Sequence, residues 1–169
     1  MKFTKESFPV PIHTIHEMII EAREESQKSE CLRKKVGAVL LAIGANEIVG
    51  RGFGGALVTC EECLRDVEEW RQDGCWSIHS ELRAISDAMD SQGWTPDDMR
   101  ALNGEISNSN PYGDSLIMFV THGPCDQCLK YMEFFGIRTC IYEVPYHDNW
   151  KKWSGRIDVY SVGELHELL

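Results

Sequence analysis

Residues 116–135 read LIMFVTHGPCDQCLKYMEFF, and this stretch decides the fold. Leu116 to Thr121 is an apolar run of strand length, typical of a buried strand. Pro124 suits the first position of a helix, because its φ is fixed and it has no amide hydrogen to leave unpaired. Apolar residues then recur at helical spacing, at Leu129, Met132 and Phe135. The stretch predicts a strand that leads into a helix, with Cys125 and Cys128 on one face of the first helical turn.

A second motif, His79-Ser80-Glu81, also opens an amphipathic stretch. The apolar residues that follow it at helical spacing are Leu82, Ile85, Ala88 and Met89. One imidazole and two thiolates suit a tetrahedral zinc ion whose fourth position stays open, as in catalytic sites. A structural zinc site has no use for a carboxylate two residues from its histidine, whereas hydrolysis needs a proton carrier. We therefore expect His79, Cys125 and Cys128 to bind catalytic zinc and Glu81 to carry protons.

The remaining elements alternate along the chain. The pattern predicts a first helix from Ile12 to near Gln27, a small helix after Thr95-Pro96, and strands at Val36–Ile43, Glu47–Phe53, Thr139–Val144 and Asp158–Val162. A turn with Gly44 and Asn46 makes the first two strands a plausible hairpin. Helices that alternate with strands favour an α/β fold in three layers, a mixed sheet of about five strands with helices on both faces. There are no internal repeats, so residues 1–169 are expected to form a single zinc-dependent domain.

Composition restricts the class of protein. The chain has 169 residues, 43% of them hydrophobic, which is enough for a substantial core. Its formal net charge of −10 disfavours a nucleic acid partner, because an acidic chain gains little from counterion release. The longest apolar stretch, Val36 to Ala45, is too short to span a bilayer. With 7 cysteines, an odd number, and no apolar leader segment, we expect reduced thiols, a cytoplasmic location and no membrane partner.

Several further stretches resemble the deoxycytidylate (dCMP) deaminase family, within the cytidine deaminase-like zinc hydrolases. Ser29 to Val39, SECLRKKVGAV, is close to the segment with which family members enter their first strand. Gly52-Phe53-Gly54-Gly55 lies where the family has a Gly-Tyr-Asn-Gly turn, and Tyr146-His147-Asp148 is similar to the segment after its fourth strand. The His-x-Glu and Cys-x-x-Cys pair is the signature of zinc nucleobase deaminases, in which the glutamate does not bind metal.

The resemblance implies hydrolysis of dCMP to dUMP and ammonia. It implies that the carbonyl of Ser80 accepts a hydrogen bond from the substrate amine and that Tyr146 covers the base. It also implies a homohexamer in which Gly52, Phe53, Gly54 and Gly55 bind nucleotide effectors together with Mg²⁺, dCTP as activator and dTTP as inhibitor. The expected partners are therefore small nucleotides. For the substrate phosphate, Arg33 and Lys35 are candidates on sequence grounds.

Four other cysteines form a second group. Cys60 and Cys63 have the spacing of a zinc knuckle, and Cys75 and Cys31 complete a set of four; some members of the family hold a structural zinc with cysteines from these regions. The alternative is that Cys31 is a small buried residue and the others are reduced loop thiols. We favour the structural zinc, because a long polar loop has little else to stabilise it.

Two other functions are compatible with these motifs. A deaminase of another cytosine nucleotide or nucleoside, such as dCTP or cytidine, or of tRNA adenosine would keep both zinc motifs. A zinc-binding interaction module without catalytic activity would explain the cysteines but not Glu81.

The cysteine pattern predicts two zinc ions per chain. Cys63→Ser should remove about one metal equivalent and much of the stability, because a structural zinc contributes on the order of 10 kcal/mol to its folded site. Metal analysis and thermal unfolding of both proteins check this. A wild-type content of a single zinc ion would contradict it.

Overall fold

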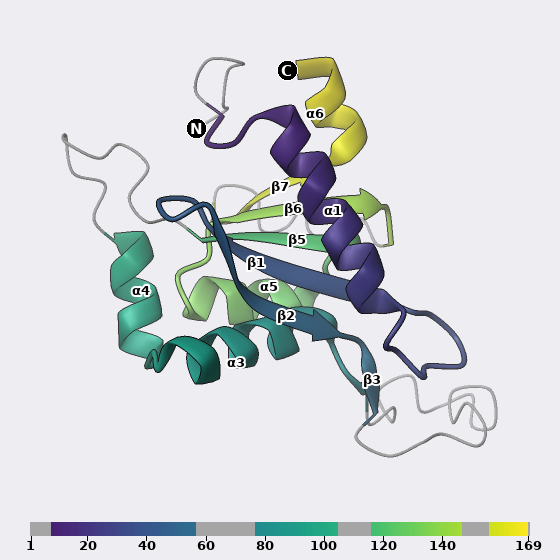
Figure 1. The fold of residues 1–169 in the computed structure, drawn as a ribbon, viewed down its shortest axis with the longest axis horizontal. Helices are drawn as coiled ribbons and strands as arrows, with labels where there is room; N and C mark the ends of the chain where they lie inside the picture. The colour runs from purple at the N-terminus through teal and green to yellow at the C-terminus, as the bar shows by residue number, and fades with distance from the viewer. Residues whose placement is uncertain (1–7, 57–76, 105–115, 147–155, 169) are drawn as a thin grey trace.

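The computed structural model describes residues 8–56, 77–104, 116–146 and 156–168, which contain a five-stranded and a two-stranded sheet (Figure 1). The large sheet consists of β1 (Gly37–Ala42), β2 (Glu47–Phe53), β5 (Leu116–His122), β6 (Thr139–Val144) and β7 (Asp158–Ser161). The small sheet pairs β3 (Gly55–Ala56) with β4 (Ser77–Ile78). The helices are α1 (Ile12–Ser26), α3 (Ser80–Gln92), α4 (Pro96–Gly104), α5 (Asp126–Phe134) and α6 (Val162–Leu168).

The strand order of the large sheet is β2-β1-β5-β6-β7. β1 is antiparallel to β2 and to β5, whereas β5, β6 and β7 are mutually parallel. In the turn between β1 and β2, Asn46 adopts a φ of 50°, which asparagine tolerates better than most residues. The prediction of an α/β fold with a mixed sheet of about five strands is confirmed. Because β1 is antiparallel to both of its neighbours, it starts at the end of the sheet where β2, β5 and β6 finish.

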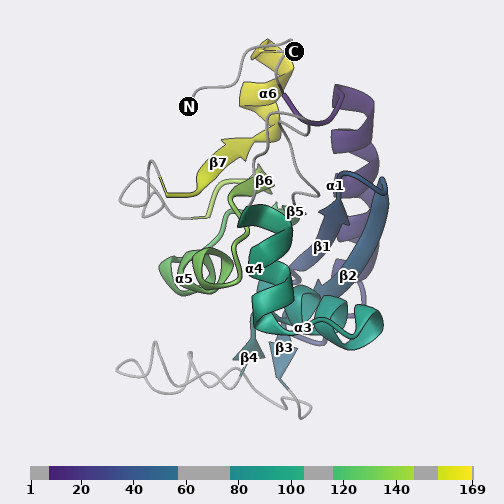
Figure 2. The same cartoon turned by 90° about the vertical axis from the view of Figure 1, so that its left-hand side faces the viewer.

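Helices cover both faces of the large sheet, and Figure 2 shows α1 and α5 on opposite sides of the strands. Alternate strand residues point to opposite faces. One face packs on α1 and α6, and its buried residues include Ile15, Ile19, Val39, Leu41, Phe119 and Leu165. The other packs on α3, α4 and α5, and its buried residues include Leu40, Ala84, Met99, Met118 and Leu129. No helix in the described ranges is both long and apolar enough to cross a bilayer.

The backbone of α3 approaches β2 more closely than side chains would permit. An ideal Cβ on Gly50 would lie 2.1 Å from the carbonyl oxygen of Ala84. A Cβ on Gly52 would lie 2.2 Å from the carbonyl oxygen of Ser80 and 2.5 Å from the nitrogen of Ala84. These two glycines therefore let the first turns of α3 rest directly on the strand.

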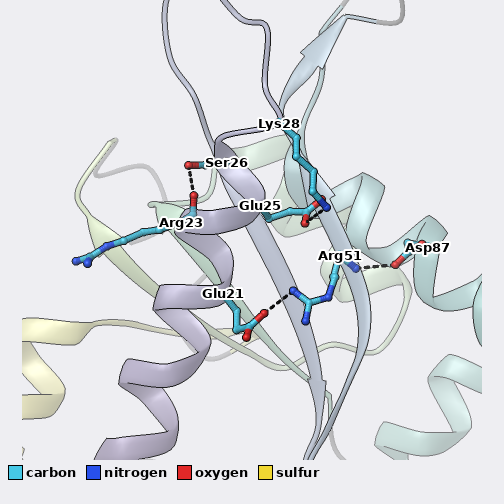
Figure 3. Close-up of polar contacts among 7 residues, drawn as sticks. All are labelled: Glu21, Arg23, Glu25, Ser26, Lys28, Arg51 and Asp87. Carbon is cyan, nitrogen blue, oxygen red and sulfur yellow. Dashed lines mark hydrogen bonds and ion pairs between the residues drawn. The ribbon is translucent and has the colours of Figure 1, made fainter.

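Arg51 of β2 joins the two helical layers at the edge of the sheet (Figure 3). Its guanidinium donates to the carboxylate of Glu21 on α1 at 2.6 Å, and its backbone N–H donates to Asp87 on α3 at 2.8 Å. The nearby Arg23 points away from this pair and forms an ion pair with Glu143 of β6. The edge strand is thus tied to α1 by a side chain and to α3 by its main chain.

Two short helices begin with reciprocal capping. At α4, the hydroxyl of Thr95 accepts the N–H of Asp98 at 3.2 Å, and the Asp98 carboxylate accepts the N–H of Thr95 at 2.8 Å. At α6, Ser161 and Glu164 make the same pair of bonds at 3.1 and 2.7 Å. The prediction that Val162 ends the last strand is wrong, because β7 ends at Ser161 and Val162 begins α6, a helix that was not predicted. The capping box at Ser161 and Glu164 was the signal that could have identified α6.

Gly52→Ala should destabilise the protein. The new methyl group would meet backbone atoms of α3 at 2.2 Å, so the helix must shift, at a cost of about 1–3 kcal/mol in the free energy of unfolding. The matched control is Gly54→Ala, whose nearest neighbours would lie at 3.7 Å and whose effect should stay below about 1 kcal/mol. Urea unfolding of both variants measures the difference. Equal stabilities would contradict the close contact between α3 and β2.

Candidate metal centre

His79, Cys125 and Cys128 meet in one cluster. The Nδ1 atom of His79 lies 3.3 Å from the sulfur of Cys125 and 3.2 Å from that of Cys128, and the two sulfurs are 3.5 Å apart. Within the part of the chain that the structure describes, this is the group of three or more His, Cys, Asp or Glu residues whose ligand atoms converge closely enough for a metal ion. Residues from two separate motifs thus present one nitrogen and two sulfur atoms to a common point.

Both motifs lie at the beginnings of helices. His79 is the N-cap of α3, directly after β4, and Cys125 is the N-cap of α5. The sulfur of Cys125 accepts the N–H of Cys128 at 3.5 Å, so the helix itself orients the first thiol. The prediction that Pro124 takes the first helical position is wrong: Pro124 lies before the N-cap, and Cys125 takes the capping role. A sulfur at the amino end of a helix is favoured as thiolate.

The donor set fits zinc. Tetrahedral zinc, with bonds of about 2.0–2.1 Å to nitrogen and about 2.3 Å to sulfur, holds nitrogen and sulfur ligands about 3.6 Å apart and two sulfurs about 3.8 Å apart. The observed separations of 3.2–3.5 Å are close to these values. The hydrogen bond shared with Cys128 lowers the pKa of Cys125 to about 3, whereas that bond and burial raise the pKa of Cys128. Three side chains leave the fourth position of a tetrahedral ion open.

Glu81 lies in the first turn of α3, two residues after His79, and is only 4% exposed. Burial raises the pKa of its carboxyl group, which therefore holds a proton more readily than an exposed glutamate. The hydroxyl of Ser80 donates to Oε2 of Glu81 at 3.1 Å. This contact of the Ser80 side chain was not predicted, since the expected role of Ser80 concerned its backbone carbonyl alone.

The expected substrate residues lie on several elements. The carbonyl oxygen of Ser80 lies against Gly52 of β2. Tyr146 follows β6 and is 40% exposed, while Arg33 and Lys35 are exposed in the segment between α1 and β1. The ring of Tyr146 contacts Lys34, whose Nζ atom is 4.0 Å from the ring centroid. The roles of Ser80, Tyr146, Arg33 and Lys35 in binding substrate remain predictions.

The expected turn at Gly52-Phe53-Gly54-Gly55 is wrong, because Gly52 and Phe53 end β2, Gly54 links the two strands and Gly55 begins β3. The N–H of Gly54 donates to the carbonyl of Val36 at 2.7 Å, and the carbonyl of Gly54 accepts from the hydroxyl of Ser29. Arg83 of α3 donates to the carbonyl of Gly55 at 2.9 Å, and its guanidinium lies 4.6 Å from the centroid of the Phe53 ring. The close packing of α3 explains why residue 52 must be glycine. A glycine at this position is therefore not by itself evidence for a nucleotide site.

The second group of cysteines is only partly described. Cys31 is half-buried, and its sulfur accepts the N–H of Lys34 at 3.5 Å. Cys60, Cys63 and Cys75 lie outside the described residues. The second zinc site therefore remains a prediction. His147 and Asp148, which contributed to the resemblance, also lie outside the described ranges.

Comparison with solved structures supports the same fold. The dCMP deaminase of cyanophage S-TIM5 in apo form matches with a TM-score of 0.63 at 19% identity, covering 90% of this chain and 99% of that one. The same enzyme in complex with dCMP and dUMP matches with a TM-score of 0.60 at 21% identity, covering 90% and 98%. A Thermotoga maritima diaminohydroxyphosphoribosylaminopyrimidine deaminase/5-amino-6-(5-phosphoribosylamino)uracil reductase matches with a TM-score of 0.59 at 19% identity, covering 93% of this chain and 38% of that one.

Comparison with sequences defines the family. No curated protein sequence matches the chain. The model of the cytidine and deoxycytidylate deaminase zinc-binding region matches residues 12–144, which include both zinc motifs and most of the described sheet. The chain therefore belongs to the cytidine and deoxycytidylate deaminase family.

Proposed function

We propose that this protein converts dCMP and water to dUMP and ammonia, as a zinc-dependent hydrolase acting in the cytoplasm. The observation that carries the proposal is the convergence of His79, Cys125 and Cys128 beside a buried glutamate. The choice of substrate is supported by the likeness to the S-TIM5 enzyme that was solved with dCMP and dUMP. The acidic net charge of −10 favours a small nucleotide over a nucleic acid.

Each residue has a distinct task in this mechanism. His79, Cys125 and Cys128 would hold the zinc ion, which when bound supplies a water that ionises near neutral pH. Glu81 accepts one proton of the attacking water and delivers it to ring nitrogen N3. It then takes the remaining proton from the new C4 hydroxyl and passes it to the amine, so that the C–N bond breaks, ammonia leaves and the C4 carbonyl of dUMP forms. Its burial suits this task, because a raised pKa allows the carboxyl group to hold the proton between the two transfers.

The direct test is ammonia release from dCMP, dCTP, cytidine and adenosine. We expect turnover of dCMP to exceed that of the other three, because dCMP is the substrate that the family resemblance implies. Higher turnover of dCTP or cytidine would reassign the substrate within the same chemistry. Zinc bound without release of ammonia from any of them would favour a binding module.

Glu81→Gln is the control that connects this activity to the site. The variant should keep its fold and zinc content while kcat for dCMP falls by at least about 10²-fold, because the amide cannot carry the proton. Circular dichroism and metal analysis verify the first two properties. Near-normal turnover would remove Glu81 from the mechanism.

We also propose regulation of the oligomer, for which the family resemblance implies a hexamer. In this proposal dCTP with Mg²⁺ activates and dTTP inhibits, at the segment formed by Gly52, Phe53, Gly54 and Gly55. The amide of Gly54 already donates to Val36, so an effector must use the other groups of this segment. Titration of both triphosphates against dCMP should show sigmoidal kinetics that dCTP abolishes. Hyperbolic kinetics unchanged by either nucleotide, in a preparation shown to be oligomeric, would mean that this glycine segment has only a structural role.

A further inference from the structure

The segment that carries Lys34 enters the sheet beside the metal centre. It connects α1 to β1, and the N–H of Gly37, the first residue of β1, donates to the hydroxyl of Thr121 at 3.2 Å. Thr121 lies near the end of β5, the strand that leads to Cys125. Lys34 therefore lies at the end of the sheet where α5 and its two cysteines begin.

Lys34 contacts Tyr146, which follows β6. Its Nζ atom lies 4.0 Å from the centroid of the Tyr146 ring. The Tyr146 segment is held beside the cysteine motif, because the N–H of Gly123 donates to the carbonyl of Val144 at 2.9 Å. Such an exposed contact between a cation and a ring is weak, so it positions the ammonium group and leaves it available to an anion.

The charge of Lys34 acts close to the metal centre. Burial, followed by the charge of Lys34, lowers the pKa of His122, which lies three residues before Cys125, although Glu143 opposes this effect. Glu143 is itself paired with Arg23, and Lys28 on the same side of the sheet is paired with Glu25 at 2.6 Å. Lys34 has no ion pair within the described part of the chain.

We infer that Lys34 binds the phosphate group of the nucleotide substrate, with the ring of Tyr146 supporting its ammonium group. The inference rests on the proposed function. A phosphate in a chain of net charge −10 needs a cation that no carboxylate neutralises, and Lys34 meets this condition among the described residues. It also revises the expectation from sequence, which had selected its two neighbours, Arg33 and Lys35. A lysine at this position distinguishes a nucleoside monophosphate from the corresponding nucleoside.

The test compares dCMP with deoxycytidine, which lacks the phosphate. In Lys34→Gln, KM for dCMP should rise by about tenfold or more, as expected for the loss of one charge-assisted hydrogen bond, while kcat changes little. The kcat/KM for deoxycytidine should stay within about twofold of wild type. Lys34→Arg should restore most of the affinity for dCMP. Lys130→Gln, which removes an exposed charge from α5, is the matched control and should behave as wild type.

Product binding gives a second readout that does not depend on turnover. Calorimetry should show that Lys34→Gln weakens binding of dUMP and leaves binding of deoxyuridine unchanged. An unchanged KM for dCMP together with an unchanged affinity for dUMP would overturn the inference. So would an equal loss of kcat/KM for dCMP and deoxycytidine, or an equal loss of affinity for dUMP and deoxyuridine. Each of these results would leave the proposed function intact. A wild-type enzyme that deaminates cytidine or deoxycytidine but not dCMP would instead overturn the proposed function.

Discussion

The close contact between α3 and β2 is the constraint on which the candidate site depends. Gly50 and Gly52 carry no side chains, so helix and strand backbones lie against each other. In such a contact the position of the helix is set by main-chain atoms, which cannot adjust as flexible side chains can. His79 and Glu81 lie at the end of α3 that rests on Gly52, so this contact fixes the imidazole and the carboxylate relative to the sheet.

The sheet brings the second half of the site to the same place. β1 pairs with β2 on one side and with β5 on the other, and it is antiparallel to both. The last residues of β2 and β5 therefore lie at the same end of the sheet, where α3 and α5 begin. The imidazole comes from one helix and the two thiols from the other, so the metal centre joins two helices whose separation the sheet already sets. The segment that carries Lys34 enters the sheet at the same end and adds a positive charge there.

Local patterns were sufficient to predict most of this architecture. The two zinc motifs, the hairpin and the helix capped by Thr95 all depend on residues close together in the sequence, and so their signals were readable. Contacts between residues far apart in the sequence gave no such local signal. The role of Gly52 in packing depends on the backbone of α3, and the sequence analysis therefore assigned this glycine to nucleotide binding. Lys34 was passed over for a similar reason, since its contact with Tyr146 joins segments that are far apart along the chain. The short helix α6 was missed because 7 residues, about two turns, offer little periodicity.

Arg51 has a consequence for how this chain meets its own copies. An edge strand normally exposes N–H and C=O groups onto which a strand of another molecule can add, and this is a route to aggregation. On β2 the Asp87 carboxylate already accepts the Arg51 N–H, and the Arg51 side chain is paired with Glu21. Extension of the sheet past this position would have to break the first bond and crowd charged groups. Association between copies by extension of the sheet past Arg51 of β2 is therefore disfavoured, and the strand on which α3 rests stays at the border of the sheet.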